Sequence, residues 1–285
     1  MNAEIRPLPP GLYFVATPIG TARDITLRAL DILASADVIA SEDTRTTRKL
    51  MDIHGIALRD RPLIAYHDHS TDAVRARLIK SLAAGQSVAY ASEAGTPMIS
   101  DPGYALARDV TAAGYLVTSA PGPSAVIAAL TIAGLPTDRF LFAGFLPNAQ
   151  TARRTALQEF THTPATLVFY ESPKRIHKTL ADIADIYGQD REIAVCRELT
   201  KKFEEVLRGP VSEVISAIAD RTLKGEIVIC VDKNRTTTDS ATMEDALKDA
   251  LLTMSVKDAA NAVSIALGLP KRVVYQAALN IGKPE

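Results

Sequence analysis

The sequence predicts an α/β protein of two domains with a small helical extension at its C-terminal end. Three observations lead to this fold class. In the first half, short runs rich in β-branched and aromatic residues alternate with helix-like segments, which is typical of a parallel sheet covered on both faces. In the second half, two strand-like runs follow each other without a helix between them, which predicts a mixed sheet. A polar segment then precedes three helix-like segments.

The predicted first domain covers residues 1–136. Its strand-like runs are bounded by Pro, Gly, Asp or Ser, and they span residues 12–17, 37–43, 62–67, 87–93 and 115–121. Between them apolar residues recur at intervals of three and four, as in residues 24–35, which predicts helices. Ligands of such sheets bind at the carboxyl ends of the strands. A binding site is therefore expected in the loops that follow these strands.

The predicted second domain covers residues 137–233. Its strand-like segments are residues 139–146, 165–172, 191–199, 203–209 and 225–233, and its helices are expected at 151–160, 173–187 and 211–221. Residues 234–242 are almost free of aliphatic side chains and predict a linker. The extension, residues 243–285, has a helix-turn-helix outline, in which Gly268 ends the second helix and Pro270 begins the third.

Composition limits the functions that the chain can have. With 47% hydrophobic and 23% charged residues it is an ordinary globular protein, and its net charge of −1 leaves only local patches for nucleic-acid binding. Cys196 and Cys230 lie in apolar runs outside any CxxC pair, which suits a reducing compartment. The N-terminal residues do not resemble a signal peptide, and the most apolar stretch, residues 125–135, is shorter than the ~20 residues of a membrane helix. We therefore predict a cytoplasmic protein without membrane contact.

Several common motifs are missing from the sequence. It has no G-x-G pair, no GxxxxGK[ST] and no GxSxG, which argues against nicotinamide oxidoreductases, P-loop NTPases and serine hydrolases. His67 and His69 flank Asp68, but a polar capping loop explains them better than a metal site, which needs further ligands. We predict no metal.

Four segments after predicted strands carry chemistry. The loop at 91–104 combines two glycines, two prolines, acids and hydroxyls, which favours a ligand loop over a plain connection. Residues 121–125, PGPSA, open a small-residue helix that suits either a ligand or close packing. Basic residues at 44–49 and 172–178 suit phosphate, although solvated helix faces explain them as well.

Taken in order, TPIG, SEDTR, AGTP-x-ISDPG, PGPSA, GLP-x-DRF-x-F-x-GFLP, FYES, RELTK and GE(I/V)VI resemble the ribosomal RNA small-subunit methyltransferase I family, from about Leu12 to Asp232. The resemblance implies a two-domain tetrapyrrole-methylase-like fold and a homodimer. It also implies that S-adenosyl-L-methionine, bound between the domains, methylates the 2′-hydroxyl of a cytidine in 16S ribosomal RNA. The C-terminal helices resemble the helical extension of that family.

The same resemblance implies a set of cofactor contacts: Pro18, Ser92, Glu93, Ala94, Gly95, Ser100, Ser124, Ala125, Tyr170, Leu199 and Glu226. Three positions depart from the family pattern. Glu93 stands where relatives have Asp, Thr21 where they have Asn, and Lys174 where His is frequent. These departures put single contacts in doubt, but not the resemblance.

Methyl transfer to a ribose hydroxyl requires alignment and a proton acceptor. The candidate acceptors that follow predicted strands are Glu42, Asp43, Glu171 and Lys201. Candidate RNA contacts are the cations Arg45, Arg48, Lys174, Arg175, Lys271 and Arg272. Internal ion pairs are the alternative role for these residues. Two other functions stay open: methylation of a tetrapyrrole or of a modified protein histidine by the same fold, and a non-catalytic RNA-binding factor in ribosome assembly.

Overall fold

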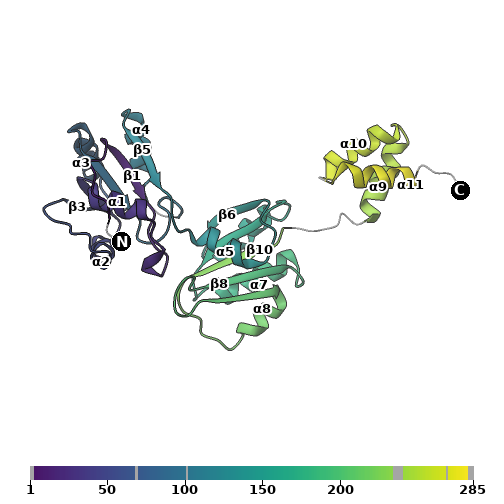
Figure 1. The fold of residues 1–285 in the computed structure, drawn as a ribbon. Coiled ribbons are helices and arrows are strands. Elements are labelled where there is room, and N and C mark those ends of the chain that lie inside the picture. The colour runs from purple at the N-terminus through teal and green to yellow at the C-terminus, as the bar shows by residue number, and fades with distance from the viewer. Residues whose placement is uncertain (1–2, 68–69, 101, 234–239, 268, 282–285) are drawn as a thin grey trace. The chain divides into compact units, whose positions relative to one another are not determined.

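The computed structural model describes residues 3–67, 70–100, 102–233, 240–267 and 269–281. It divides into two compact units, Met1–Lys233 and Asn234–Glu285. The first unit holds two sheets and the second holds three helices (Figure 1). Within the described residues, no helix is both long and apolar enough to span a membrane.

The first sheet is parallel and has five strands in the order β3-β2-β4-β1-β5. These strands are β1 (Gly11–Val15), β2 (Val38–Ser41), β3 (Leu63–Ala65), β4 (Ser87–Ala91) and β5 (Leu116–Ala120). The helical segments between them are η1 (Ala22–Asp24), α1 (Leu27–Ser35), α2 (Thr44–Ile53), α3 (Asp72–Ala83) and α4 (Tyr104–Ala112).

Alternating side chains of the first sheet face two different cores. Tyr13 and Val15 of β1 pack in the core that α1 and α2 cover, because successive strand residues point to opposite faces. Leu12 and Phe14 pack with the apolar residues of α3 and α4 on the other face. Burial on both faces explains why these strands read as nearly continuous apolar runs in the sequence.

The second sheet has five strands in the order β6-β7-β10-β8-β9. They are β6 (Phe140–Phe145), β7 (Thr166–Glu171), β8 (Glu192–Arg197), β9 (Glu205–Pro210) and β10 (Ile227–Val231). Strands β6 and β7 are parallel, and the other neighbours are antiparallel. Its core on one face includes α6 (Gln150–Glu159), α7 (Ile176–Tyr187) and α8 (Val211–Ile218). A parallel sheet followed by a mixed sheet confirms the predicted fold class.

Helix α5 (Ala125–Ala133) connects the two halves of this unit. It follows β5 of the first sheet, yet Val126, Ala129 and Leu130 pack against the face of the second sheet that carries Val168 and Val228. Figure 1 shows α5 beside β6 and β10. The boundary predicted at residue 136 therefore follows the order of the chain, whereas the packing assigns α5 to the second sheet.

The second unit is a three-helix cluster of α9 (Ser240–Leu251), α10 (Val256–Leu267) and α11 (Lys271–Ile281). Its core contains Leu247, Ala260, Val263, Val274 and Ala278. Most of the predicted linker, and Gly268, lie outside the described residues. The carbonyl of Pro270 accepts the first hydrogen bonds of α11, from the amides of Val273 and Val274, so the third helix begins where the sequence predicts.

Candidate functional site

The loops after β1 and β4 are tied together. The amides of Thr17 and Gly95 each donate to the other's carbonyl, at 2.9 and 3.0 Å. Ser92 Oγ donates to the Gly95 carbonyl (2.5 Å), and Thr17 Oγ1 donates to the Ser92 carbonyl (3.1 Å). Gly95 has a φ of +82°, which favours glycine because it has no side chain. The buried hydroxyls of Thr17 and Ser92 therefore shape this loop.

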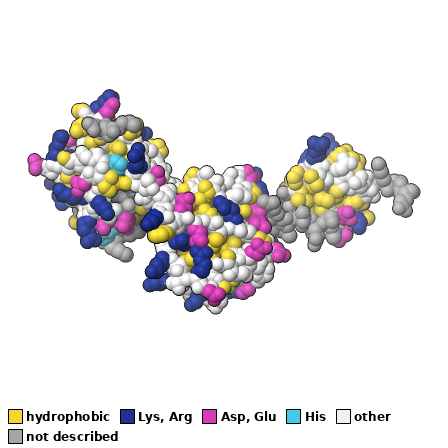
Figure 2. Space-filling model, turned by 60° about the horizontal axis from the view of Figure 1, so that its bottom comes forward, with side chains coloured by type: hydrophobic (Ala, Val, Ile, Leu, Met, Phe, Trp, Pro, Cys, Tyr) yellow, Lys and Arg dark blue, Asp and Glu magenta, His cyan; other side chains and the backbone are white. Residues whose placement is uncertain are grey.

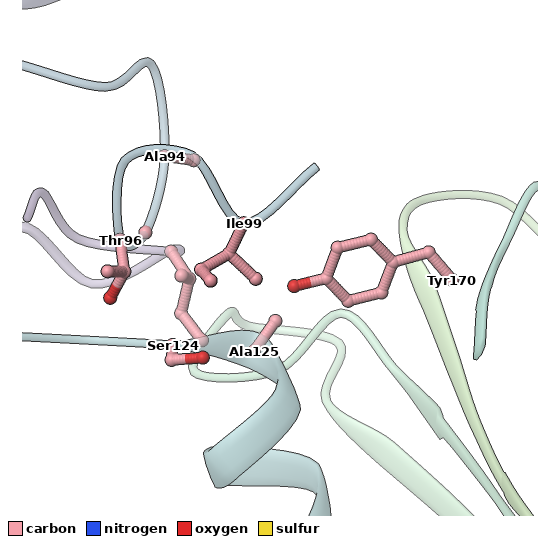
Figure 3. A pocket seen from close by; sticks show the side chains of 8 residues that line it. Ala94, Thr96, Ile99, Ser124, Ala125 and Tyr170 are labelled. Carbon is pink, nitrogen blue, oxygen red and sulfur yellow. The ribbon is translucent and has the colours of Figure 1, made fainter. Parts of the chain in front are cut away.

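A small open pocket lies at the end of these loops (Figure 3), and its lining residues are Ile19, Ala94, Gly95, Thr96, Ile99, Ser124, Ala125 and Tyr170. Tyr170 comes from β7 of the second sheet and extends toward Ile99 of the first domain's loop. Ser124 and Ala125 lie at the start of α5. The lining combines the apolar side chains of two isoleucines and two alanines with the hydroxyls of Thr96, Ser124 and Tyr170.

The same loop continues through strained backbone. Met98 and Ser100 have φ values of +68° and +60°, a region that residues with side chains rarely adopt. Such strain persists where surrounding structure fixes it, and it clusters at ligand sites. Met98 and Ile99 also keep much of their apolar surface exposed. Of these two residues, Ile99 presents its apolar side chain at the pocket.

A turn of the second domain, residues 198–202, packs against the TPIG loop. A Cβ on Gly20 would lie 2.5 Å from Thr200 Oγ1 and 2.6 Å from Lys201 Cγ, so only glycine fits there. Thr21 Oγ1 donates to the Thr200 carbonyl (2.5 Å), and Thr200 Oγ1 accepts from the Thr21 amide (3.2 Å). Thr21, one of the departures from the family pattern, thus joins the two halves directly.

Lys201 forms two ion pairs in this turn. Its Nζ lies 2.8 Å from Glu198 Oε1 and 2.6 Å from Glu226 Oε2. Burial opposes protonation of Lys201, but the hydrogen bonds to both carboxylates outweigh it and raise the lysine pKa. The bond from Lys201 in turn lowers the pKa of Glu198. A lysine with a raised pKa keeps its proton at neutral pH, so Lys201 suits hydrogen-bond donation better than proton acceptance.

Asp43 and Arg45 stand at the end of β2, next to β4 in the sheet. Asp43 Oδ1 accepts a hydrogen bond from the Arg45 amide at 2.8 Å and so caps α2. This bond is the largest cause of the lowered pKa of Asp43, and the hydrogen bond from the Arg45 side chain is the next largest. The Arg45 side chain is 91% exposed and that of Asp43 is 30% exposed. The ionised carboxylate of Asp43 and the guanidinium of Arg45 are therefore both accessible from solvent.

Glu171 and Arg175 stand at the end of β7 and have the opposite surroundings. The Glu171 side chain is fully buried, and its oxygens accept from the Ser172 amide (2.7 Å), Thr179 Oγ1 (2.5 Å) and Arg175 Nη2 (3.1 Å). Arg175 also donates to the Leu146 carbonyl (2.6 Å) and to Asn148 Oδ1. Both groups are thus engaged inside the protein, which is the ion-pair alternative that the sequence left open. Their predicted roles in proton transfer and RNA binding stay predictions.

The structure separates the predicted cofactor residues into two groups. Ala94, Gly95, Ser124, Ala125 and Tyr170 line the pocket. The others lie in its supporting loops: Ser92 holds Gly95, Leu199 is in the core beside Ile19, and Glu226 pairs with Lys201. That these residues bind a cofactor stays a prediction.

Pro18, Glu93 and Ser100 belong to the same loops without lining the pocket. Sequence reasoning missed Ile19, Thr96 and Ile99 as lining residues. All three lie inside the TPIG and AGTP-x-IS segments, so the motifs contained the signal, but the individual residues did not stand out.

The other predicted RNA contacts, Arg48, Lys174, Lys271 and Arg272, are exposed. On the face that Figure 2 shows, basic side chains lie singly or in small groups between acidic and polar ones. This agrees with the net charge of −1, which leaves only local patches for phosphate. Among the described residues, no group of three His, Cys, Asp or Glu side chains could hold a metal ion.

Comparison with known families assigns both units. Residues 11–215 match the family described as Tetrapyrrole (Corrin/Porphyrin) Methylases, and residues 237–282 match the RsmI C-terminal HTH domain. The chain is 45% identical to the ribosomal RNA small subunit methyltransferase I of Mesorhizobium japonicum, over 97% of this chain and 94% of that one. It is 44% identical to the protein of the same name from Vibrio cholerae, over 96% of each chain, and 42% identical to that of Escherichia coli O157:H7, over 94% of each.

Solved structures show the same fold at low identity. The methyltransferase CobJ superposes with a TM-score of 0.60 at 18% identity, covering 79% of this chain and 94% of its own. Diphthine synthase superposes with a TM-score of 0.57 at 14% identity, covering 78% of this chain and 89% of its own. At these identities the likeness concerns the fold.

Proposed function

The chain belongs to the tetrapyrrole methylase family and, within it, to the ribosomal RNA small subunit methyltransferase I proteins, and we propose that it methylates the 2′-hydroxyl of a cytidine in 16S ribosomal RNA. One observation carries the proposal. Relatives of that name match nearly the whole chain at 42–45% identity, including the helical extension. A solved uroporphyrin-III-C-methyltransferase shares the fold at only 20% identity.

The residues of the pocket suit the binding of part of S-adenosyl-L-methionine, including its carboxylate group. Ala94, Gly95 and Ala125 leave the backbone open to a ligand, since their side chains are small or absent. Ser124 begins α5 without a side-chain cap, so the helix start offers amide donors for a carboxylate. Tyr170 and Ile99 supply the apolar side. When bound, this cofactor supplies a methyl group on a positively charged sulfur.

The protein must also take a proton from the attacking hydroxyl. Glu171 has hydrogen-bond donors on both oxygens, and Lys201 keeps its proton. Glu42 and Asp43 are the remaining candidates, and Asp43 is ionised at neutral pH and 30% exposed. We therefore assign the proton acceptor to Asp43, which would accelerate the reaction by roughly 10²–10⁴-fold. Arg45, on the same helix start, would hold a neighbouring phosphate.

The proposed setting is a cytoplasmic homodimer that acts on the small ribosomal subunit. Phosphate contacts would come from the exposed cations at Arg45, Arg48 and Lys174, and from Lys271 and Arg272 at the start of α11. The chain has few basic patches, so electrostatic attraction to RNA is weak. We therefore favour the assembled small subunit as the substrate over free RNA, because its folded RNA can be recognised by shape.

The test is methyl transfer from labelled S-adenosyl-L-methionine to small subunits that lack their own modification, with the modified nucleotide mapped. The expected result is 2′-O-methylcytidine at one position. Cofactor binding without transfer to subunits or to free ribosomal RNA would overturn the proposal and favour a tetrapyrrole or protein substrate. Failure to bind the cofactor would favour a non-catalytic assembly factor.

A further inference from the structure

Strand β6 ends in an aromatic side chain beside the pocket. Phe145 is 58% exposed, and its ring centroid lies 5.5 Å from that of Tyr170, at an interplanar angle of 64°. Tyr170 itself lines the pocket and reaches across it toward Ile99 (Figure 3). The exposed ring of Phe145 therefore contacts a residue of the pocket wall from outside the pocket.

A β-bulge gives Phe145 this position. The pairing of β6 with β7 runs Phe142 to Val168 and then skips a residue, so that Phe145 pairs with Tyr170. Without the extra residue, Phe145 would point to the other face of the sheet, because successive side chains alternate. Gly144 makes the bulge possible with a φ of +64°, and a Cβ there would lie 3.4 Å from Ser100 Oγ. The bulge thus directs an apolar ring to the side where the pocket lies.

Two arginines hold the loop that follows Phe145. Arg175, paired with buried Glu171, donates to the Leu146 carbonyl and to Asn148 Oδ1. Arg153, paired with Asp182 at 2.7 Å, donates to the Asn148 carbonyl at 3.1 Å. We call residues 146–148 with these four charged side chains the loop clamp. The two ion pairs therefore anchor the loop directly after Phe145 through the Leu146 and Asn148 carbonyls.

We propose that Phe145 is a substrate-contacting residue on which the base of the target nucleotide, or of its neighbour, stacks, and that the loop clamp positions it. The inference rests on the proposed function, since it requires an RNA substrate. Proteins read unpaired nucleotides by stacking their bases on aromatic rings. The chain has no tryptophan and only 5% aromatic residues, so an exposed ring that touches a pocket-lining tyrosine is well placed for this task.

The main experiment compares Phe145→Ala with Phe140→Ala in methyl transfer to unmodified small subunits. Phe140 is a matched control, because it lies on the same strand with 43% exposure, at the end away from the pocket. Loss of a stacked base costs about 1–3 kcal/mol, so F145A should raise the KM for RNA by about 5- to 150-fold. The Kd for S-adenosyl-L-methionine should not change. F140A should leave both constants as they are.

Salt dependence separates stacking from phosphate contact. The loss of affinity in F145A should be the same at low and high salt, because no counterion is released when a base stacks. A KM that rises equally in both variants, or not at all in F145A, would overturn the proposal. So would a dissociation of the F145A protein into smaller species on gel filtration, which would place Phe145 in a subunit interface.

Tryptophan fluorescence tests the position of the ring. Phe145→Trp introduces the only tryptophan of the chain and keeps an aromatic surface, so the RNA affinity should stay near that of the unaltered protein. Its emission should change when the subunit binds, whereas that of Phe140→Trp should not. Adding Asn148→Ala, which removes one acceptor of the loop clamp, should shift the F145W emission before any RNA is present. If the emission did not shift, the loop clamp would not position Phe145.

The unaltered protein, assayed in parallel, distinguishes the two levels of failure. If it methylates ribosomal RNA and F145A behaves as it does, only the role of Phe145 is wrong. If it binds the cofactor but transfers no methyl group to ribosomal RNA, the proposed function fails, and the stacking role fails with it.

Discussion

Two carboxylate–arginine pairs in this protein look alike in sequence and differ in the structure. Asp43 and Arg45 follow β2, whereas Glu171 is the last residue of β7 and Arg175 follows it. The first pair is open, with the arginine 91% exposed, whereas in the second pair the glutamate is fully buried and the arginine is 21% exposed. The first pair is accessible from solvent, whereas the second pair is engaged by the protein's own loops. Burial, rather than residue type, therefore distinguishes the two pairs.

The largest expected effect concerns the open carboxylate. Asp43→Asn should lower kcat by roughly 10²–10⁴-fold, because the amide cannot accept the proton of the hydroxyl. The helix cap should persist, since Asn caps helices as well as Asp does. Single-turnover methyl transfer and cofactor binding measure the two effects separately. If Glu171→Gln abolished the chemical step and D43N did not, the assignment of roles would be reversed.

A second prediction concerns the other buried pair of the loop clamp. In Arg153–Asp182 both side chains are at most 3% exposed. Asp182→Asn leaves Arg153 buried without its counter-charge, so the free energy of unfolding should fall by about 3–5 kcal/mol. Urea denaturation followed by circular dichroism measures it. As a control, Asp185→Asn removes an exposed partner of Arg154 and should cost far less.

The same pair sets a pH dependence. Burial opposes ionisation of Asp182, but hydrogen bonds from Arg153, Gln150 and Arg154 outweigh it and lower its pKa. A lowered pKa in the folded state means that the pair's contribution is present above the usual aspartate pKa of about 3.9 and is lost as the pH falls through the folded value. The stability difference between the unaltered protein and D182N should therefore shrink below about pH 4. A difference that stays constant into acid would show that Asp182 does not act through its charge.

A moderate effect is expected for the open arginine. Arg45→Ala should weaken binding to the small subunit and leave cofactor binding unchanged. Losing one phosphate contact should reduce the slope of log affinity against log salt by about 0.7–0.9. Arg6→Ala is the control, because Arg6 is exposed but precedes β1, at the amino end of the first sheet. An unchanged slope in R45A would show that Arg45 does not contact an RNA phosphate.

The smallest effect concerns Lys201, which is intermediate in burial between the two pairs. Lys201→Met should lower stability at neutral pH by no more than about 1 kcal/mol, since the ion pairs are partly exposed. Because the folded pKa of Lys201 is raised, its contribution is present below the usual lysine pKa of about 10.4 and is lost as the pH rises through the folded value. Denaturation at pH 7 and above pH 11 checks this. A larger loss at high pH would contradict the sign.

The sequence alone predicted where the strands lie. Short apolar runs separated by helix-like segments identified the strands of both sheets, because a strand that is buried on both faces is a nearly continuous run of apolar residues. The ordered motifs also led to the loops that form the pocket, since TPIG, AGTP and PGPSA all follow parallel strands. Helix α7 begins at Ile176, three residues later than predicted, after the turn from Ser172 to Arg175.

The tertiary structure alone decided what covers each residue. The sequence did not predict that α5 packs against the second sheet rather than the first. It also did not predict that Arg175 donates a hydrogen bond to the Leu146 carbonyl. It could not tell that the bulge at Gly144 sends Phe145 to the pocket side. Secondary structure follows from neighbours along the chain, whereas burial and pairing depend on segments far apart in sequence. Asp43 and Glu171 therefore look equivalent in the sequence and differ only once the chain has folded.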